Sequence, residues 1–170
     1  MGVMTLASEA HLDEIDRRIL EELQEGARIT YTELGRRVAL TAPAVADRVR
    51  RLEEAGVITG FRTHLEPAAL GYSITAFIRW TAAGQDCSQL GEVAKDIPEI
   101  VECHRITGEN SYVLKVVARD VRHLEGLIDR LMPWGSTITS VVTSSPVRHR
   151  TLQPAEAAGE ASRGTESRTA

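Results

Sequence analysis

The sequence lacks the features of disulfide-rich and membrane-spanning proteins. Its 170 residues include only two cysteines, Cys87 and Cys103, which stand far apart without a C-x-x-C pairing. Such cysteines form neither a metal knuckle nor a redox pair, and they suit a reducing cytosol. No run approaches the roughly 18 to 20 apolar residues that cross a bilayer, and no charged segment followed by an apolar core opens the chain. We expect a cytoplasmic protein with free thiols and no membrane segment.

The sequence also lacks an excess of positive charge. It holds 20 lysines and arginines against 24 aspartates and glutamates, for a formal net charge of -4. Proteins that coat nucleic acid through bulk electrostatics are usually strongly basic. Any contact with DNA must therefore come from a local basic surface.

Catalytic signatures are missing as well. The chain has no serine in a G-x-S-x-G turn, no P-loop and no H-E-x-x-H motif. Metal-ligand spacing is absent among its five histidines, which are His11, His64, His104, His123 and His149. We expect no enzymatic activity, no cofactor and no metal site.

The apolar spacing changes character once along the chain. Before Gly56, apolar residues recur every three or four positions, as in helices. After Gly71, helical spacing alternates with the every-second-residue spacing of strands. The first ten residues are mostly small and follow no apolar period, and residues 154–170 contain no large apolar residue, so we expect both ends to be disordered. The predicted divisions are a disordered start (1–10), a DNA-binding domain (11–65), a linker (66–72), a second domain (73–152) and a disordered tail (153–170).

The first domain is predicted to contain three short helices. The first follows the N-cap Asp13, buries Leu12, Ile15, Ile19 and Leu23, and ends at Gly26. The second begins with the pattern of a capping box, in which Thr30 and Glu33 bind each other's backbone amides, and it buries Tyr31, Leu34 and Val38.

The third helix has Thr41 as its N-cap, Pro43 in its first turn and Gly56 as its left-handed stop. It buries Val45, Val49 and Leu52. Only Leu40 and Thr41 separate it from the second helix, which is the spacing of a helix-turn-helix. Residues 57–65 then fit a small strand or wing.

The second domain alternates strands and helices. Strands are predicted at 74–80, 100–107, 112–118 and 137–143, and helices at 90–97 and 124–131. This order is the ferredoxin-like βαββαβ plan, so the chain is an α+β protein with a winged helix-turn-helix followed by a ferredoxin-like domain. Apolar residues lie on both faces of the strands, and a second copy of the domain is the simplest cover for the face without helices.

The outward face of the third helix is the candidate DNA-binding surface. Arginines anchor phosphates and bind guanine edges, and small residues let a helix lie deep in the major groove. The alternative is a solvated face on which Arg48, Arg50 and Arg51 pair with neighbouring acids. The candidate DNA-binding residues are Thr41, Pro43, Ala44, Asp47, Arg48, Arg50, Arg51, Arg36 and Arg37.

Several separated motifs in this order resemble the leucine-responsive regulator (Lrp/AsnC) family. The resemblance covers roughly Leu12 to Arg150 and is carried by 12–20, 31–34, 48–58, 67–72 and 107–109. It implies a regulator that binds double-stranded DNA, forms homodimers that assemble into tetramers or octamers, and responds to an amino acid or related metabolite.

In that family the metabolite binds where sensing domains meet, around a G-x-x-D loop. The matching stretch here is 108–111, where Ser111 replaces the usual aspartate. A hydroxyl only hydrogen-bonds to a ligand ammonium, which leaves Glu109 or backbone carbonyls to supply negative charge. The effector candidates are His104, Gly108, Glu109, Asn110, Ser111, Tyr112 and Thr139. An ordinary hairpin turn, a structural histidine and a polar outward strand face are the alternatives.

Two other functions stay open at this level. Some proteins that resemble the family decarboxylate tetrapyrroles, although the arginine-bearing third helix disfavours that activity. A ligand-blind architectural DNA protein is the second alternative, favoured if Ser111 has removed sensing.

Overall fold

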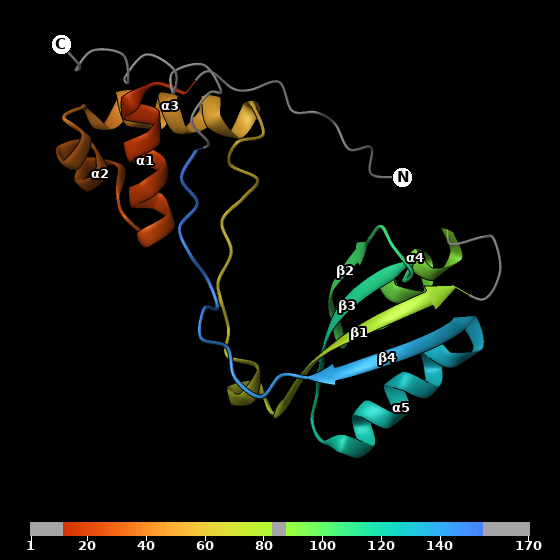
Figure 1. The fold of residues 1–170 in the computed structure, drawn as a ribbon. Coiled ribbons are helices and arrows are strands. Elements are labelled where there is room, and N and C mark those ends of the chain that lie inside the picture. The colour runs from red at the N-terminus through yellow and green to blue at the C-terminus, as the bar shows by residue number, and fades with distance from the viewer. Residues whose placement is uncertain (1–11, 83–87, 155–170) are drawn as a thin grey trace, which may run out of the picture. The chain divides into compact units, whose positions relative to one another are not determined.

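The structure is a computed structural model that describes residues 12–82 and 88–154. Its described residues form two compact units, one of residues 12–62 with 149–154 and one of residues 63–148 (Figure 1). The predictions for residues 1–10 and for Cys87 lie outside the described residues, as does nearly all of the predicted tail.

The N-terminal unit contains three helices, α1 (Glu14–Glu25), α2 (Tyr31–Val38) and α3 (Ala42–Glu54). Its buried core consists of Ile19, Leu23, Leu34, Val38, Val45, Val49 and Leu52. All seven belong to the predicted apolar stripes, because residues three and four apart share one face of a helix. The predicted burial of Tyr31 is wrong, because this residue is exposed. Tyr31 is the first residue of α2, one turn before Leu34, where the buried part of the helix begins.

A tight turn joins α2 to α3. Ala39 ends α2 in the left-handed conformation, with φ of 57°, and the Leu40 amide donates to the carbonyl of Gly35 at 2.8 Å. Thr41 then begins α3, and its hydroxyl accepts a hydrogen bond from the Ala44 amide. This turn confirms the predicted helix-turn-helix.

The strand expected within residues 57–65 is not formed in this structure. The amides of Val57 and Ile58 both donate to the Leu52 carbonyl, at 2.9 and 3.1 Å, so they complete the end of α3 instead of a strand ladder. Their side chains pack against the three-helix core. Residues 59–66 then continue without regular secondary structure.

The second unit has the predicted ferredoxin-like fold. Its elements are the 3-10 helix η1 (Pro67–Leu70), β1 (Ile74–Ala82), α4 (Ser88–Lys95), β2 (Ile100–Arg105), β3 (Tyr112–Ala118), α5 (Val121–Leu131), the 3-10 helix η2 (Met132–Trp134) and β4 (Gly135–Val141). The four strands pair antiparallel in the order β2-β3-β1-β4. None of the helices in the described part of the chain is long and apolar enough to cross a membrane.

Both helices of this unit pack on the same face of the sheet. Ala76, Ile78 and Trp80 of β1 are fully buried there, together with Leu90 of α4 and Leu127 of α5. The strand register puts Thr137 and Thr139 of β4 on this face too, opposite Trp80 and Ile78. The expected polar outward face of β4 is therefore wrong at these threonines, because the register that pairs Phe77 with Ser140 turns them toward the helices.

The opposite face of the sheet has no helix over it in the described structure. Phe77 on β1 and Ile138 on β4 are 42% and 55% exposed there. Charged side chains share the face, including Arg79 and an ion pair of 2.7 Å between Lys115 and Glu102. A helix-free face with exposed apolar residues was the sequence prediction.

The chain returns to the first unit after β4. The Gln24 side chain of α1 binds the backbone of Leu152 twice, accepting from its amide at 2.8 Å and donating to its carbonyl at 3.0 Å. Residues 149–154 thus group with the N-terminal unit. This long-range contact leaves no signal in the apolar pattern.

Candidate nucleic-acid interface and ligand site

The third helix presents a polar face to solvent. Pro43, Asp47, Arg50 and Arg51 are exposed, whereas Ala44 is half-buried on the flank. Pro43 and Asp47 are one turn apart, and the two arginines follow on the next turn. These four exposed positions were assigned to DNA contact from the sequence, whereas the assigned Ala44 and Arg48 are half-buried.

Arg50 is paired within its own helix. Its guanidinium donates to Asp47 at 2.9 Å and to Glu54 at 2.8 Å, and this contact lowers the pKa of Asp47. The intrahelical pairing weighed from the sequence therefore occurs at Arg50. The Arg51 side chain makes neither a hydrogen bond nor an ion pair with any residue that the structure describes, which leaves its guanidinium available for a phosphate or a base.

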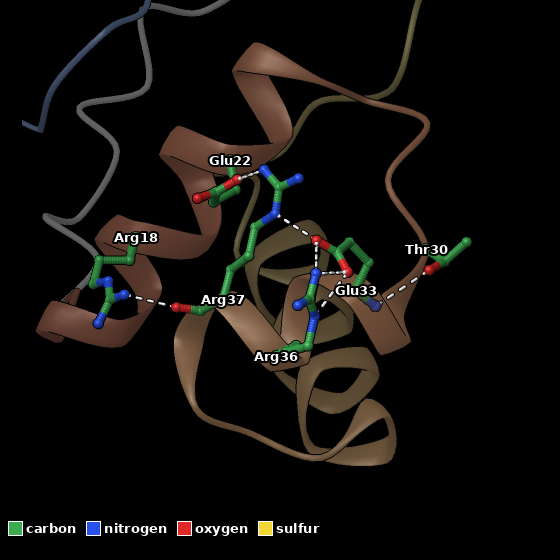
Figure 2. A network of polar contacts seen from close by, with 6 residues as sticks. All are labelled: Arg18, Glu22, Thr30, Glu33, Arg36 and Arg37. Atoms are coloured by element: carbon green, nitrogen blue, oxygen red, sulfur yellow. Dashed lines mark hydrogen bonds and ion pairs between the residues drawn. The ribbon is translucent and has the colours of Figure 1, made fainter.

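A second group of arginines lies at the end of α2 (Figure 2). Glu33 binds both of them, with Arg36 at 2.6 Å and Arg37 at 2.9 Å, and these hydrogen bonds lower the pKa of Glu33. Arg37 also reaches Glu22 of α1 at 2.6 Å. Glu33 therefore contacts both guanidinium groups, and Glu22 contacts that of Arg37 alone.

This network corrects the capping box expected at α2. The Thr30 hydroxyl accepts from the Glu33 amide at 3.2 Å, as expected, but the Glu33 carboxylate binds arginines instead of the Thr30 amide (Figure 2). Two cations one turn along the helix are stronger partners for a carboxylate than a neutral amide. A complete capping box occurs at α1 instead, between Asp13 and Asp16.

Most of these ion pairs are easily exchanged. The side chain of Arg36 is 77% exposed and that of Arg50 is 56% exposed. Exposed pairs of this kind contribute roughly 0 to 1 kcal/mol, because water and salt screen them. A DNA phosphate can therefore replace the carboxylate at these arginines with little loss of stability.

Arg48 differs from the other arginines. It leaves α3 toward α1, where it contacts Asp13 at 2.6 Å and Asp16 at 2.7 Å, and its side chain is only 20% exposed. The pKa of Arg48 is raised by the Asp13 and Asp16 hydrogen bonds. The structure does not bring Arg48 to the exposed face with Arg50 and Arg51.

The candidate ligand loop lies at one end of the sheet, between β2 and β3. Gly108 has φ of 108°, a conformation that favours glycine. The Ser111 hydroxyl accepts from the Ala82 amide at 3.2 Å, and the Ser111 amide donates to the Trp80 carbonyl at 3.0 Å. Ser111 thereby attaches the loop to the end of β1.

Two neighbours of Ser111 strengthen this attachment. Asn110 accepts from the Thr81 hydroxyl at 3.3 Å, and the Tyr112 ring packs against Trp80 with a centroid separation of 6.5 Å. Sequence reasoning missed the participation of Thr81 and Ala82. The signal was the strand register, because pairing Trp80 with Tyr112 brings the preceding loop over the end of β1.

The remaining ligand candidates are spread over the unit. His104 faces the helix-free side of β2, near Glu102 at 3.6 Å, whereas Thr139 lies on the helix side of β4. These strands form opposite edges of the sheet, so the two side chains do not meet within this chain. Glu109 is exposed in the loop. Residues 12–82 and 88–154 contain no group of three metal-ligating side chains.

Two family models match the chain, one for each unit. The model described as winged helix-turn-helix DNA-binding matches residues 12–59. The model described as Lrp/AsnC ligand binding domain matches residues 75–152. An uncharacterized HTH-type transcriptional regulator of Bacillus subtilis, YezC, is 42% identical over 138 residues, covering 81% of this chain and 98% of the relative.

Solved structures with the same fold cover both units. LrpC of Bacillus subtilis has a TM-score of 0.77 at 32% identity, covering 80% of this chain and 97% of LrpC. A feast or famine regulatory protein of Mycobacterium tuberculosis, complexed with L-methionine, also has a TM-score of 0.77 at 32% identity. That likeness covers 83% of this chain and 99% of the other.

Proposed function

Because the chain belongs to the Lrp/AsnC family of transcriptional regulators, we propose that it binds specific double-stranded DNA sequences and that an amino acid or related metabolite modulates its assembly or DNA affinity. The observation that supports DNA binding most directly is the exposed face of α3, where Arg50 and Arg51 stand in an otherwise acidic chain. The relatives are named as transcriptional regulators, which are not enzymes, so tetrapyrrole decarboxylation is set aside.

DNA recognition is proposed to use the N-terminal unit. Thr41, Pro43, Ala44, Asp47 and Arg51 enter or border the major groove, with Arg50 released from its acids. Arg36 and Arg37 anchor phosphates beside the groove. A helix-turn-helix dimer would present two such helices to successive major-groove faces.

The proposed effector site is built around residues 108–112. The M. tuberculosis relative was crystallised with L-methionine, which makes an amino acid the first ligand to test. The Ser111 hydroxyl accepts a hydrogen bond from the Ala82 amide and is neutral, so it supplies no negative charge to a ligand ammonium. Glu109 is the acidic residue in this loop and is proposed to take that role. His104 and Thr139 would contribute only through neighbouring copies.

Assembly is proposed to begin at the helix-free face of the sheet. Exposed Phe77 and Ile138 there need a cover, and a second copy supplies a matching apolar surface. Homodimers would then associate into tetramers or octamers. Ligand binding shifts DNA affinity only if the ligand binds one arrangement more tightly than another.

The deciding experiment is a mobility shift with DNA from just upstream of the gene for this protein, with and without L-methionine and the other amino acids. A retarded complex that one amino acid alters supports the whole proposal. A retarded complex indifferent to all of them, with footprints along any AT-rich DNA, favours the architectural alternative. Absence of retardation contradicts DNA binding.

Arg51→Ala sharpens this test, because Arg51 is exposed on α3 without an ion pair to a described residue. Loss of a bidentate base contact should weaken binding by about 1 to 3 kcal/mol. Arg122→Ala is the matched control, since it removes the same charge from an exposed position on α5. Equal effects of the two variants would contradict the assignment of α3 to the groove.

A further inference from the structure

Arg48 enters a site formed by the two carboxylates at the start of α1. One nitrogen of its guanidinium, Nη1, lies 2.6 Å from Oδ2 of Asp13 and 2.7 Å from Oδ1 of Asp16. Arg48 belongs to α3, whereas Asp13 and Asp16 lie at the start of α1, more than 30 positions away in the sequence. This contact therefore joins α3 to α1 directly.

The same two carboxylates form the capping box of α1. Oδ1 of Asp13 accepts from the Asp16 amide at 2.8 Å, and Oδ2 of Asp16 accepts from the Asp13 amide at 3.3 Å. Each carboxylate thus gives one oxygen to the helix cap and the other to Arg48. The cap hydrogen bonds hold both carboxylates in the positions at which they contact Arg48.

Burial separates Arg48 from the other arginines near α3. Its side chain is 20% exposed and that of Asp16 is 16% exposed, whereas Arg50 and its two acids are all more than half exposed. A less exposed pair is less screened by water and salt. Withdrawing Arg48 to reach a phosphate would also leave two neighbouring carboxylates without their cation.

We propose that Arg48 is a positioning residue that holds the recognition helix α3 on the first turn of α1 and does not itself contact DNA. This inference rests on the proposed DNA-binding function. It assigns a structural link to Asp13, Asp16 and Arg48, and leaves Arg50 and Arg51 as the DNA-contacting arginines of α3.

The test compares Arg48→Ala with the double variant Asp13→Asn and Asp16→Asn. Asparagine is as good an N-cap as aspartate, so the double variant keeps the helix start while removing both charges. Removing two acids from a DNA-contacting surface normally strengthens binding. If Arg48 instead positions α3, loss of its two aspartate partners weakens DNA binding. The direction of the change in DNA affinity therefore distinguishes a positioning role of Arg48 from a DNA-contacting role.

Binding is measured by fluorescence anisotropy with a labelled duplex from upstream of the gene, over a range of salt concentrations. We expect both variants to bind about tenfold more weakly, and the triple variant no more weakly than either. The slope of log affinity against log salt should stay as in the wild type. The inference is overturned if Arg48→Ala lowers that slope by about 0.9, the value for one lost phosphate contact, while the double variant binds as tightly as the wild type or more so.

The exposed pair of Arg50 and Asp47 supplies the matched control. Arg50→Ala should weaken binding and lower the salt slope, and Asp47→Asn should strengthen binding.

A second measurement needs no DNA. Urea unfolding of the wild type, Arg48→Ala, the double aspartate variant and the triple variant forms a thermodynamic mutant cycle that measures the coupling between Arg48 and the two aspartates. We expect a coupling of about tenfold in the unfolding equilibrium constant. A duplex that the wild type does not bind would contradict the proposed function, whereas an absent coupling would overturn the link between α3 and α1.

Discussion

A Cβ atom on Gly35 would lie 2.4 Å from the carbonyl oxygen of Leu40. Real Cβ atoms do not approach backbone that closely, so the turn of the helix-turn-helix closes only with glycine at this position. We expect Gly35→Ala to displace α2 from the turn, lower the free energy of unfolding by about 1 to 3 kcal/mol and weaken DNA binding. Urea unfolding and a mobility shift measure the two effects.

Gly126→Ala is the control for that substitution. Gly126 lies inside α5, and a Cβ built there meets nothing within 4 Å. Alanine should stabilise the helix by roughly 0.5 to 1 kcal/mol, because glycine loses more backbone freedom on folding. If Gly35→Ala were equally tolerated, the close approach of Leu40 would not constrain the turn.

The N-cap of α2 gives a second prediction. The Thr30 hydroxyl accepts from the Glu33 amide, so Thr30→Ala should lower the free energy of unfolding by about 1 kcal/mol. Thr30→Ser keeps an oxygen at the same place and should stay close to the wild type. Chemical denaturation of the three proteins tests this, and equal losses for alanine and serine would contradict the cap.

Glu99 gives a prediction for acid stability. A hydrogen bond from its own backbone amide lowers the pKa of Glu99, and His123, 3.1 Å away, lowers it further. A carboxyl with a lowered pKa in the folded state stabilises the protein above its unfolded pKa, and this stabilisation disappears as the pH falls through the folded pKa.

Glu99→Gln should remove that dependence. Between about pH 6 and about pH 3, the wild type should lose more unfolding free energy than the variant, as measured by urea unfolding at each pH. Identical losses in the two proteins would show that Glu99 makes no contribution to acid sensitivity.

The helix-free face of the sheet predicts the assembly state. Ile138 of β4 is exposed and lies opposite Arg79 of β1. The glutamate that Ile138→Glu introduces can pair with Arg79, so the sheet is preserved, while its charge interrupts the apolar surface of the helix-free face. We expect a folded protein that sediments as a monomer. Val121→Glu places the same change at an exposed position on α5 and should leave assembly intact. A dimer retained by Ile138→Glu would contradict assembly through this face.

Most of the fold could be predicted because its signals are local. Val45, Val49 and Leu52 are buried as their spacing predicts, and Ile78 and Trp80 are buried as the alternation of β1 predicts. The orientation of Thr139 could not be predicted. It depends on the register of β4 against β1, and a shift of one residue reverses every side chain of a strand.

The candidate DNA-binding face was predicted less completely. The exposed positions of Arg50 and Arg51 follow from the helical wheel. The pairing of Arg48 with Asp13 and Asp16 does not follow from the helical wheel. These aspartates lie at the start of another helix, and only the packing of α1 on α3 brings them near Arg48. Likewise, nothing local indicates that Ser111 attaches its loop to Ala82.

The contact of Gln24 with Leu152 has a consequence for the order in which the protein is made. A chain leaves the ribosome from its N-terminus, and domains generally fold as they emerge. The helices of the first unit are therefore complete long before residue 152 exists, and all of residues 63–148 must be synthesised in between. During that interval the Gln24 side chain has no contact with the Leu152 backbone. The unit that begins the chain is thus among the last to acquire all of its contacts.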